Sequence, residues 1–122
     1  MENKMTQHKE VYKCDICGNI VEVLHTGAGK LVCCGESMRL LSAKTKEGGS
    51  EKHLPVIKED RVSIGEVEHP SEEDHYIEWI EVNTGDDSCK TFLSPGDKPE
   101  VLTNRKVLST RIYCNIHGLW KS

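Results

Sequence analysis

Short runs of alternating apolar and polar residues recur through the second half of the chain, and clusters of turn-forming residues separate them. The alternation in Arg61–Val67 and the β-branched and aromatic content of Tyr76–Val82 predict two extended strands. Four shorter pieces continue the pattern, namely Thr91–Leu93, Val101–Leu102, Lys106–Leu108 and Arg111–Cys114. Sustained helical periodicity is absent. Strands at this spacing, with Asn-, Asp-, Gly- and Pro-containing turns between them, predict a small antiparallel β-sandwich.

The first part of the chain has a different pattern, in which short apolar runs lie beside paired cysteines. The runs Ile20–Leu24 and Leu31–Val32 are typical of a small hairpin-rich module that folds around a metal ion. The polar stretch 42–52 contains a Gly-Gly pair and predicts a linker or exposed loop. We therefore predict a mainly β chain, with a metal module in residues 1–40 and a β-sandwich in residues 41–122.

The composition limits the kinds of function open to the chain. Hydrophobic residues make up 36% of the 122 residues and aromatic residues 5%, so the core is lean and bound metal would help to stabilise it. A net charge of −4 argues against a nucleic-acid partner. No apolar run is long enough to span a membrane, and the polar first 13 residues lack the apolar region of a secretory signal. We therefore expect a cytoplasmic protein, in which the six cysteines are thiolate ligands rather than disulfides.

Four cysteines of the first module have the spacing of a metal site, and they are Cys14, Cys17, Cys33 and Cys34. Two cysteine pairs give a tetrahedral S4 site that suits zinc or a single iron, and a disulfide is a further reading. The adjacent pair Cys33-Cys34 is unusual, because neighbouring residues reach one ion only if the backbone bends sharply between them. Gly35 follows and eases such a bend. This element favours an FeS4 centre, and the module resembles desulforedoxin, a small iron protein with this cysteine arrangement.

A second candidate set combines four imidazoles with one thiol: His53, His69, His75, Cys114 and His117. Zinc prefers four tetrahedral ligands, whereas five mixed nitrogen and sulfur donors suit a redox-active transition metal with an open position. If these side chains converge, they indicate an iron enzyme for a small oxygen species. We read His8 and His25 as ordinary surface or core residues. Cys89 is read as a half-buried free thiol.

The sequence around the second set resembles desulfoferrodoxin, the two-iron class of superoxide reductase. The resemblance rests on four segments and extends from Tyr12 to Lys121, and the segments are Glu51–Ile57, His69-Pro70, His75–Glu81 and Cys114–Lys121. It implies an immunoglobulin-like sandwich for the second domain and iron at both sites, with zinc as an alternative at the first. It further implies four equatorial imidazoles, an axial thiolate from Cys114 and an open sixth position.

The resemblance also implies an activity, the one-electron reduction of superoxide to hydrogen peroxide. Lys52 would attract the anion and hold a proton-donating water, and Glu51 would close the sixth position after turnover; the alternative for both is an ordinary solvated side chain. An electron donor such as rubredoxin and a homodimer are expected as partners. Two other classes remain open, a non-enzymatic electron carrier that uses the FeS4 centre alone and a zinc-stabilised interaction module.

Overall fold

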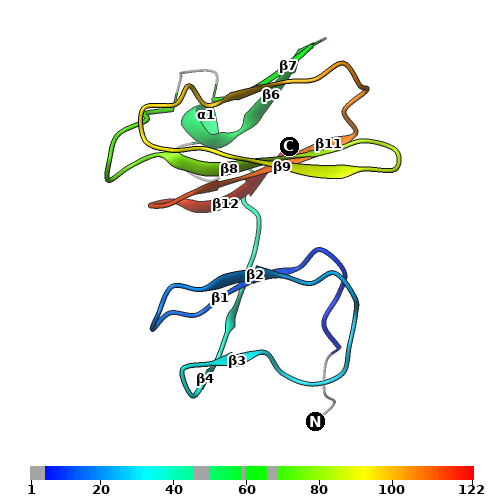
Figure 1. Cartoon of the computed structure of the whole chain (residues 1–122), viewed down its shortest axis with the longest axis vertical. Coiled ribbons are helices and arrows are strands. Elements are labelled where there is room, and N and C mark those ends of the chain that lie inside the picture. The colour runs from blue at the N-terminus through cyan, green and yellow to red at the C-terminus, as the bar shows by residue number, and fades with distance from the viewer. Residues whose placement is uncertain (1–4, 46–49, 59, 66–68) are drawn as a thin grey trace. The chain divides into compact units, whose positions relative to one another are not determined.

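The computed structural model describes residues 5–45, 50–58, 60–65 and 69–122 (Figure 1). The chain divides into two compact units, Met1–Ser42 and Ala43–Ser122. Both are built from antiparallel strands, so the predicted fold class is confirmed. The helix α1 (Ser50–His53) has four residues, and no helix in the described ranges is long enough to cross a membrane.

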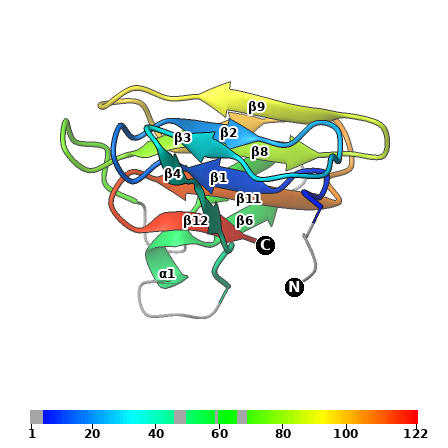
Figure 2. The ribbon, with the colours of Figure 1, turned by 90° about the horizontal axis from the view of Figure 1, so that it is seen from below.

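Unit 1 contains a three-stranded sheet and a two-stranded hairpin. The sheet has the order β2-β1-β5, with β1 at Val11–Lys13, β2 at Ile20–Glu22 and β5 at Arg39–Leu41. The hairpin pairs β3 (Val32–Cys33) with β4 (Glu36–Ser37) (Figure 2). The strands of unit 1 are only two or three residues long, and few apolar side chains of the unit are buried: Val11, Cys14 and Val23. Unit 1 therefore has a very small core.

Unit 2 contains two antiparallel sheets. The four-stranded sheet has the order β12-β11-β8-β9, and its strands are β8 (Ile77–Asn83), β9 (Ser88–Phe92), β11 (Ser109–Cys114) and β12 (Gly118–Lys121). The three-stranded sheet has the order β10-β7-β6, and its strands are β6 (Pro55–Lys58), β7 (Arg61–Ile64) and β10 (Glu100–Leu102). Figure 1 shows the strands of the two sheets in separate layers.

The core of unit 2 lies between these layers. It joins Val62 and Ile64 of β7 to apolar residues of the larger sheet, which are Ile77, Ile80, Val82, Ile112, Cys114 and Trp120. A shift of register next to Tyr113 pairs Cys114 with Ile77 and Tyr113 with Trp79, so β8 has one extra residue there. Such a bulge lets residues three apart share one face of a strand. The bulge lies beside Cys114, the last residue of β11, and the Cys114 side chain is part of the core.

The other face of the four-stranded sheet holds a buried carboxylate. Glu81 is fully buried and accepts hydrogen bonds from Arg111 at 2.7 and 2.8 Å, from Lys90 at 2.7 Å and from Asn83 at 2.9 Å. Burial by itself raises the pKa of Glu81, but the hydrogen bonds from Arg111, Lys90 and Asn83 outweigh it and lower the pKa to about 2. One ionised side chain thus joins β8, β9 and β11.

The predicted strands differ from the observed ones at several places. Lys106–Leu108 is not a strand: Val107 packs against the core, and the Leu108 N–H donates to the carbonyl of Asn83, the last residue of β8, at 2.8 Å. The predicted Arg61–Val67 is observed as β7, and residues 66–68 lie outside the described part. The sequence pattern missed β6 and β12, which begin at a proline and a glycine, residues that normally mark turns.

Candidate metal centres

Five donors converge at one end of unit 2, and they are His53, His69, His75, Cys114 and His117. His53 ends α1, and Cys114 ends β11. The other three lie in the loop before β8 and in the turn before β12. Their ligand atoms all lie within 4.8 Å of one another. That spacing is about twice the length of a metal–ligand bond, ~2.0–2.3 Å, so the five atoms can surround one ion.

The four imidazoles of this group form a closed ring. Neighbouring ring centroids are 4.7 Å apart for His53 and His69, 4.8 Å for His69 and His75, 5.0 Å for His75 and His117, and 4.7 Å for His117 and His53. Adjacent rings meet edge to face, at 66°, 82°, 64° and 71° in the same order. A closed set of four nitrogens with a thiol beside it is not a tetrahedral zinc arrangement, and it fits a metal of higher coordination number.

The hydrogen bonds of the imidazoles leave nitrogen lone pairs aimed at the centre. His69 Nδ1 lies 2.7 Å from the Pro70 carbonyl, so Nδ1 carries the proton and Nε2 faces His53 Nε2 at 3.2 Å. Nε2 of His75 is buried and has no hydrogen-bond partner among the described residues. Burial lowers the pKa of His69 to about 4, which keeps the ring neutral at pH 7. A bound metal ion would satisfy a buried nitrogen such as His75 Nε2.

The thiol of the group, from Cys114, lies on the side of the site that faces the core of unit 2. Cys114 is fully buried, its Sγ lies 3.7 Å from His117 Nδ1, and the His117 backbone N–H donates to it at 3.4 Å. Burial raises the pKa of Cys114, while that amide hydrogen bond lowers it. A backbone amide of the turn thus contacts this sulfur directly. A bound cation supplies the remaining stabilisation that the thiolate needs. Because His117 is exposed, the group is open to solvent on one side.

Two residues that the sequence did not single out hold these ligands in place. The Asn115 side chain accepts from the Tyr76 N–H at 2.9 Å and donates to the Asp74 carbonyl at 3.0 Å, and so ties the loop on both sides of His75 to the Cys114 turn. Trp120 stacks on His53 at 4.6 Å and 9°, and its indole N–H donates to the His117 carbonyl at 3.2 Å. The available signal was proximity in the sequence, since Asn115 directly follows Cys114 and Trp120 follows His117 after Gly118 and Leu119.

The two residues expected to act beside the second group are neighbours on α1. Lys52 is exposed. The pKa of His117 is lowered, first by burial and then by the charges of His75, Lys44 and Lys52, so the ammonium of Lys52 is near enough to act on the site. The side chain of Glu51 lies outside the described part of the structure.

The first group of donors lies in unit 1 and consists of Cys14, Cys17, Cys33 and Cys34. The sulfurs of Cys17 and Cys33 are 3.5 Å apart, and those of Cys33 and Cys34 are 3.9 Å apart. In a tetrahedral site with metal–sulfur bonds of ~2.3 Å the sulfurs lie about 3.8 Å apart. The four cysteines therefore fit one tetrahedral ion.

The backbone around these cysteines has the bends that the sequence predicted. Gly18 has φ +87° and closes the first turn by donating to the Cys14 carbonyl at 2.9 Å. In the second turn Cys34 itself has φ 54°, followed by Gly35 at 78°. A left-handed cysteine is uncommon, and here it lets adjacent thiols point to one ion. Backbone hydrogen bonds from Cys17 and Ile16 lower the pKa of Cys14 to about 7, whereas the neighbouring thiols raise the pKa of Cys34 to about 12.

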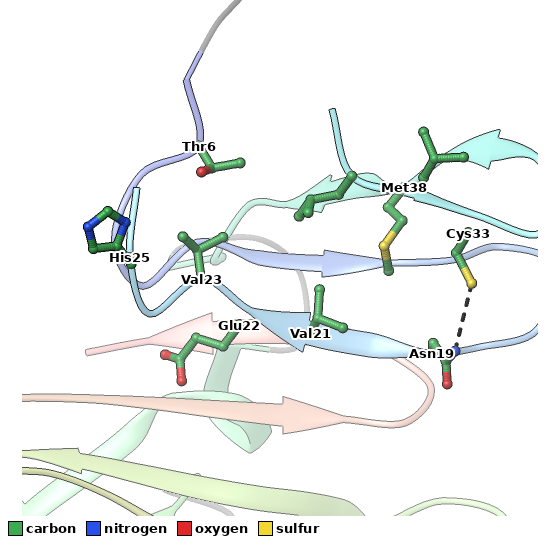
Figure 3. A pocket seen from close by; sticks show the side chains of 10 residues that line it. Thr6, Asn19, Val21, Glu22, Val23, His25, Cys33 and Met38 are labelled. Carbon is green, nitrogen blue, oxygen red and sulfur yellow. Dashed lines mark hydrogen bonds between the residues drawn. The ribbon is translucent and has the colours of Figure 1, made fainter. Parts of the chain in front are cut away.

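A hollow of about 460 Å³ lies next to the first group (Figure 3). The Asn19 amide donates to Cys33 Sγ at 3.7 Å at its edge, and Val21, Val23 and Met38 contribute apolar side chains. His25 lines the hollow, and neither His25 nor His8 belongs to a donor group.

The expectation of a half-buried Cys89 was wrong. Its thiol is free and exposed, because its side chain projects from β9 at the edge of the sheet.

Comparisons with known proteins agree with both donor groups. The model of the desulfoferrodoxin N-terminal domain matches residues 6–41, and the model of desulfoferrodoxin matches residues 45–122. The chain belongs to the desulfoferrodoxin family. A desulfoferrodoxin homolog from Archaeoglobus fulgidus is 53% identical over 97% of this chain and 99% of its own length. The resemblance seen in the sequence is thereby confirmed, and each of the two matched regions contains one of the two donor groups that could hold a metal ion.

Proteins named superoxide reductase are also similar to this chain. One from Pyrococcus horikoshii is 33% identical over 59% of this chain and 84% of its own. The crystal structure of the superoxide reductase from Treponema pallidum has a TM-score of 0.69 and covers 100% of this chain and 99% of its own at 24% identity. The structural likeness confirms the fold.

Proposed function

We propose that this chain is a superoxide reductase, which reduces superoxide to hydrogen peroxide. The observation that carries the proposal is the closed ring of four imidazoles with the buried Cys114 thiol beside it. The similarity to a protein named superoxide reductase in Pyrococcus horikoshii supports it. In this proposal residues 41–122 form the reductase domain and residues 1–40 form an FeCys4 module.

The proposed ligands of the second iron are the five converging donors, His53, His69, His75, His117 and Cys114. Iron(II) held by these residues would supply one electron to superoxide, and the Cys114 thiolate would strengthen this donation. Neutral imidazoles leave the positive charge of the site in place, which favours an anionic substrate. Superoxide takes up that electron and two protons, its oxygen–oxygen bond stays intact, and it leaves as hydrogen peroxide.

Lys52 and Glu51 are assigned complementary tasks. The exposed ammonium of Lys52, whose charge acts on His117, would attract superoxide and position a proton-donating water. Glu51 precedes it in the sequence, and its carboxylate would bind the oxidised iron after the electron has been transferred. In this scheme Lys52 acts before electron transfer and Glu51 acts after it.

The first group would serve electron supply. We assign Cys14, Cys17, Cys33 and Cys34 to an FeCys4 centre, with zinc as the alternative ion. A small electron-transfer protein such as rubredoxin is the proposed donor.

The free thiols throughout the described residues are in keeping with a reducing compartment, and we propose a cytoplasmic location.

A homodimer is proposed from the surface of unit 1. Large apolar side chains there are exposed, with 57% for Ile16, 78% for Leu24 and 58% for Val32. Small domains with so little core commonly gain stability from metal or association. Sedimentation at micromolar concentration should give twice the chain mass of 13.7 kDa, and a monomer would contradict the dimer.

The decisive experiment is anaerobic pulse radiolysis of the reduced, iron-loaded protein. Superoxide should oxidise the second centre in a fast bimolecular step and yield peroxide without oxygen. Evolution of oxygen would indicate a dismutase. A protein that shows only FeS4 bands, with no reaction at the second group, would be an electron carrier, and a colourless zinc-loaded protein would be an interaction module.

A further inference from the structure

A lysine outside the expected site residues lies beside the second donor group. Lys44 is half-buried and forms a parallel bridge with Trp120 of β12. Its backbone N–H donates to the Leu119 carbonyl at 2.9 Å, and its own carbonyl accepts from the Lys121 N–H at 3.1 Å. The backbone at Lys44 is therefore fixed against β12 by an isolated bridge with two hydrogen bonds.

The side chain of Lys44 reaches the turn that carries two proposed ligands. Its ammonium donates to the His117 carbonyl at 3.0 Å and lies 5.4 Å from the centroid of the Trp120 ring. The Trp120 indole N–H donates to the same carbonyl at 3.2 Å, and its ring stacks on His53. Lys44 thus contacts both supports of the group, the Cys114–His117 turn on one side and the Trp120–His53 stack on the other.

We propose that Lys44 is a positioning residue that holds the Cys114–His117 turn and, by its positive charge, keeps the reduction potential of the second centre high. The inference deepens the proposed function and rests on its assignment of iron to this group. An ammonium fixed beside the turn stabilises the form of the centre with less positive charge, which is the reduced one. A superoxide reductase must be in that form to meet its substrate.

The sequence gives the residue no such role, because Lys44 falls in the polar stretch expected to be a linker. Lys52 is a different case, since its side chain is exposed and its proposed partner is the incoming anion. Lys44 is hydrogen-bonded to the His117 carbonyl and would act on the centre whether or not superoxide is present. This difference makes the two lysines separable by experiment.

The test is a redox titration of the second centre in the full-length, iron-loaded protein. Lys44→Met removes the charge and the hydrogen bond, Lys44→Gln keeps a donor without the charge, and Lys44→Arg keeps both. In Lys44→Met the equilibrium should shift toward the ferric form by up to about tenfold, which corresponds to about 59 mV for a one-electron couple. Lys44→Gln should shift in the same direction, and Lys44→Arg should stay close to the unmodified protein.

Lys121→Met is the matched control, because Lys121 is an exposed lysine of β12 next to the bridge and its loss changes the net charge equally. An unchanged potential in Lys44→Met, or an equal shift in Lys121→Met, would overturn the proposal. Potentials are read without superoxide. An iron-loaded protein that fails to reduce superoxide would therefore refute the proposed function and leave the test of Lys44 intact.

Discussion

At the scale of single residues, Cys114 is the donor whose loss should be most specific. Its sulfur is the one thiol among the second group and lies in the core beneath the turn. Cys114→Ser should lower superoxide reduction by roughly a hundredfold or more and remove the ferric-thiolate band, because a hydroxyl replaces the thiolate at nearly the same size. Anaerobic kinetics and visible absorption measure both. Cys89→Ser, at a free and exposed thiol, is the control, and loss of the FeS4 bands in Cys114→Ser would mean that the two sites have been confused.

Lys52 should affect the encounter with superoxide and not the integrity of the centre. Lys52→Ala removes a positive charge near the exposed side of the group, so the bimolecular rate should fall by roughly tenfold. The rate should also depend less on ionic strength, since salt screens the attraction between a charged site and an anion. Pulse radiolysis over a range of salt concentrations measures both effects. Lys58→Ala, with an exposed side chain on β6, is the charge-matched control, and equal rates in the two variants would reduce Lys52 to a solvated lysine.

At the scale of elements, the Glu81 network should make the sandwich sensitive to acid. The pKa of Glu81 is about 2 in the folded protein and 4.5 ordinarily, so its contribution is complete above pH 4.5 and is lost as the pH falls toward 2. The shift corresponds to on the order of 3 kcal/mol of unfolding free energy. Denaturant unfolding of the metal-free protein, which avoids acid release of metal, measures it.

Glu81→Gln should flatten that part of the pH dependence. It should also lower stability at pH 7, because Lys90 and Arg111 then lose the charge they share. Glu100→Gln is the comparison, since Glu100 forms longer ion pairs of 3.6 Å with Arg61 and Lys98 at the surface. An unchanged acid transition in Glu81→Gln would remove the carboxylate from the stability of the sheet.

The elements that the sequence predicted best are those whose pattern depends on local chemistry. The alternation in β7 and the aromatic and β-branched content of β8 identified these strands, and Arg111–Cys114 was predicted as the strand that is observed as β11. The bulge in β8 could not be predicted from the sequence, because it depends on the register of β8 against β11. β12 was missed since Gly118 reads as a turn residue, while its strand conformation comes from pairing with β11.

The donor side chains could be predicted from the sequence, because few residue types bind metal ions. Their supports were not readable, since Asn115 and Trp120 act through contacts that only the fold creates. The same holds for the closed order of the imidazoles, in which His53 is a neighbour of His117, distant in sequence. Residue type thus predicts which atoms can bind, and topology decides which of them meet.

At the scale of the whole molecule, the two donor groups lie in different compact units and should be separable. Cys14→Ser should abolish the FeS4 bands, because Cys14 is one of the four thiols of the first group. Superoxide reduction by pre-reduced protein should remain within a few-fold of the unmodified rate, since the reacting centre is in unit 2. Metal analysis should give one iron per chain in place of two, and loss of both irons would show that the units depend on each other.

The stacking of Trp120 on His53 gives the molecule an optical reporter of its own. The chain has two tryptophans, and Trp79 stacks on Tyr113, away from the donors. In Trp79→Phe the fluorescence of Trp120 should fall as a metal ion binds among the four imidazoles. The reason is that His53, whose ring centroid lies 4.6 Å from that of Trp120, then becomes part of an electron-accepting centre. Fluorescence would then follow loading and loss of the second ion at concentrations too low for absorption bands. An emission that ignores added metal would mean that the stack is broken in solution.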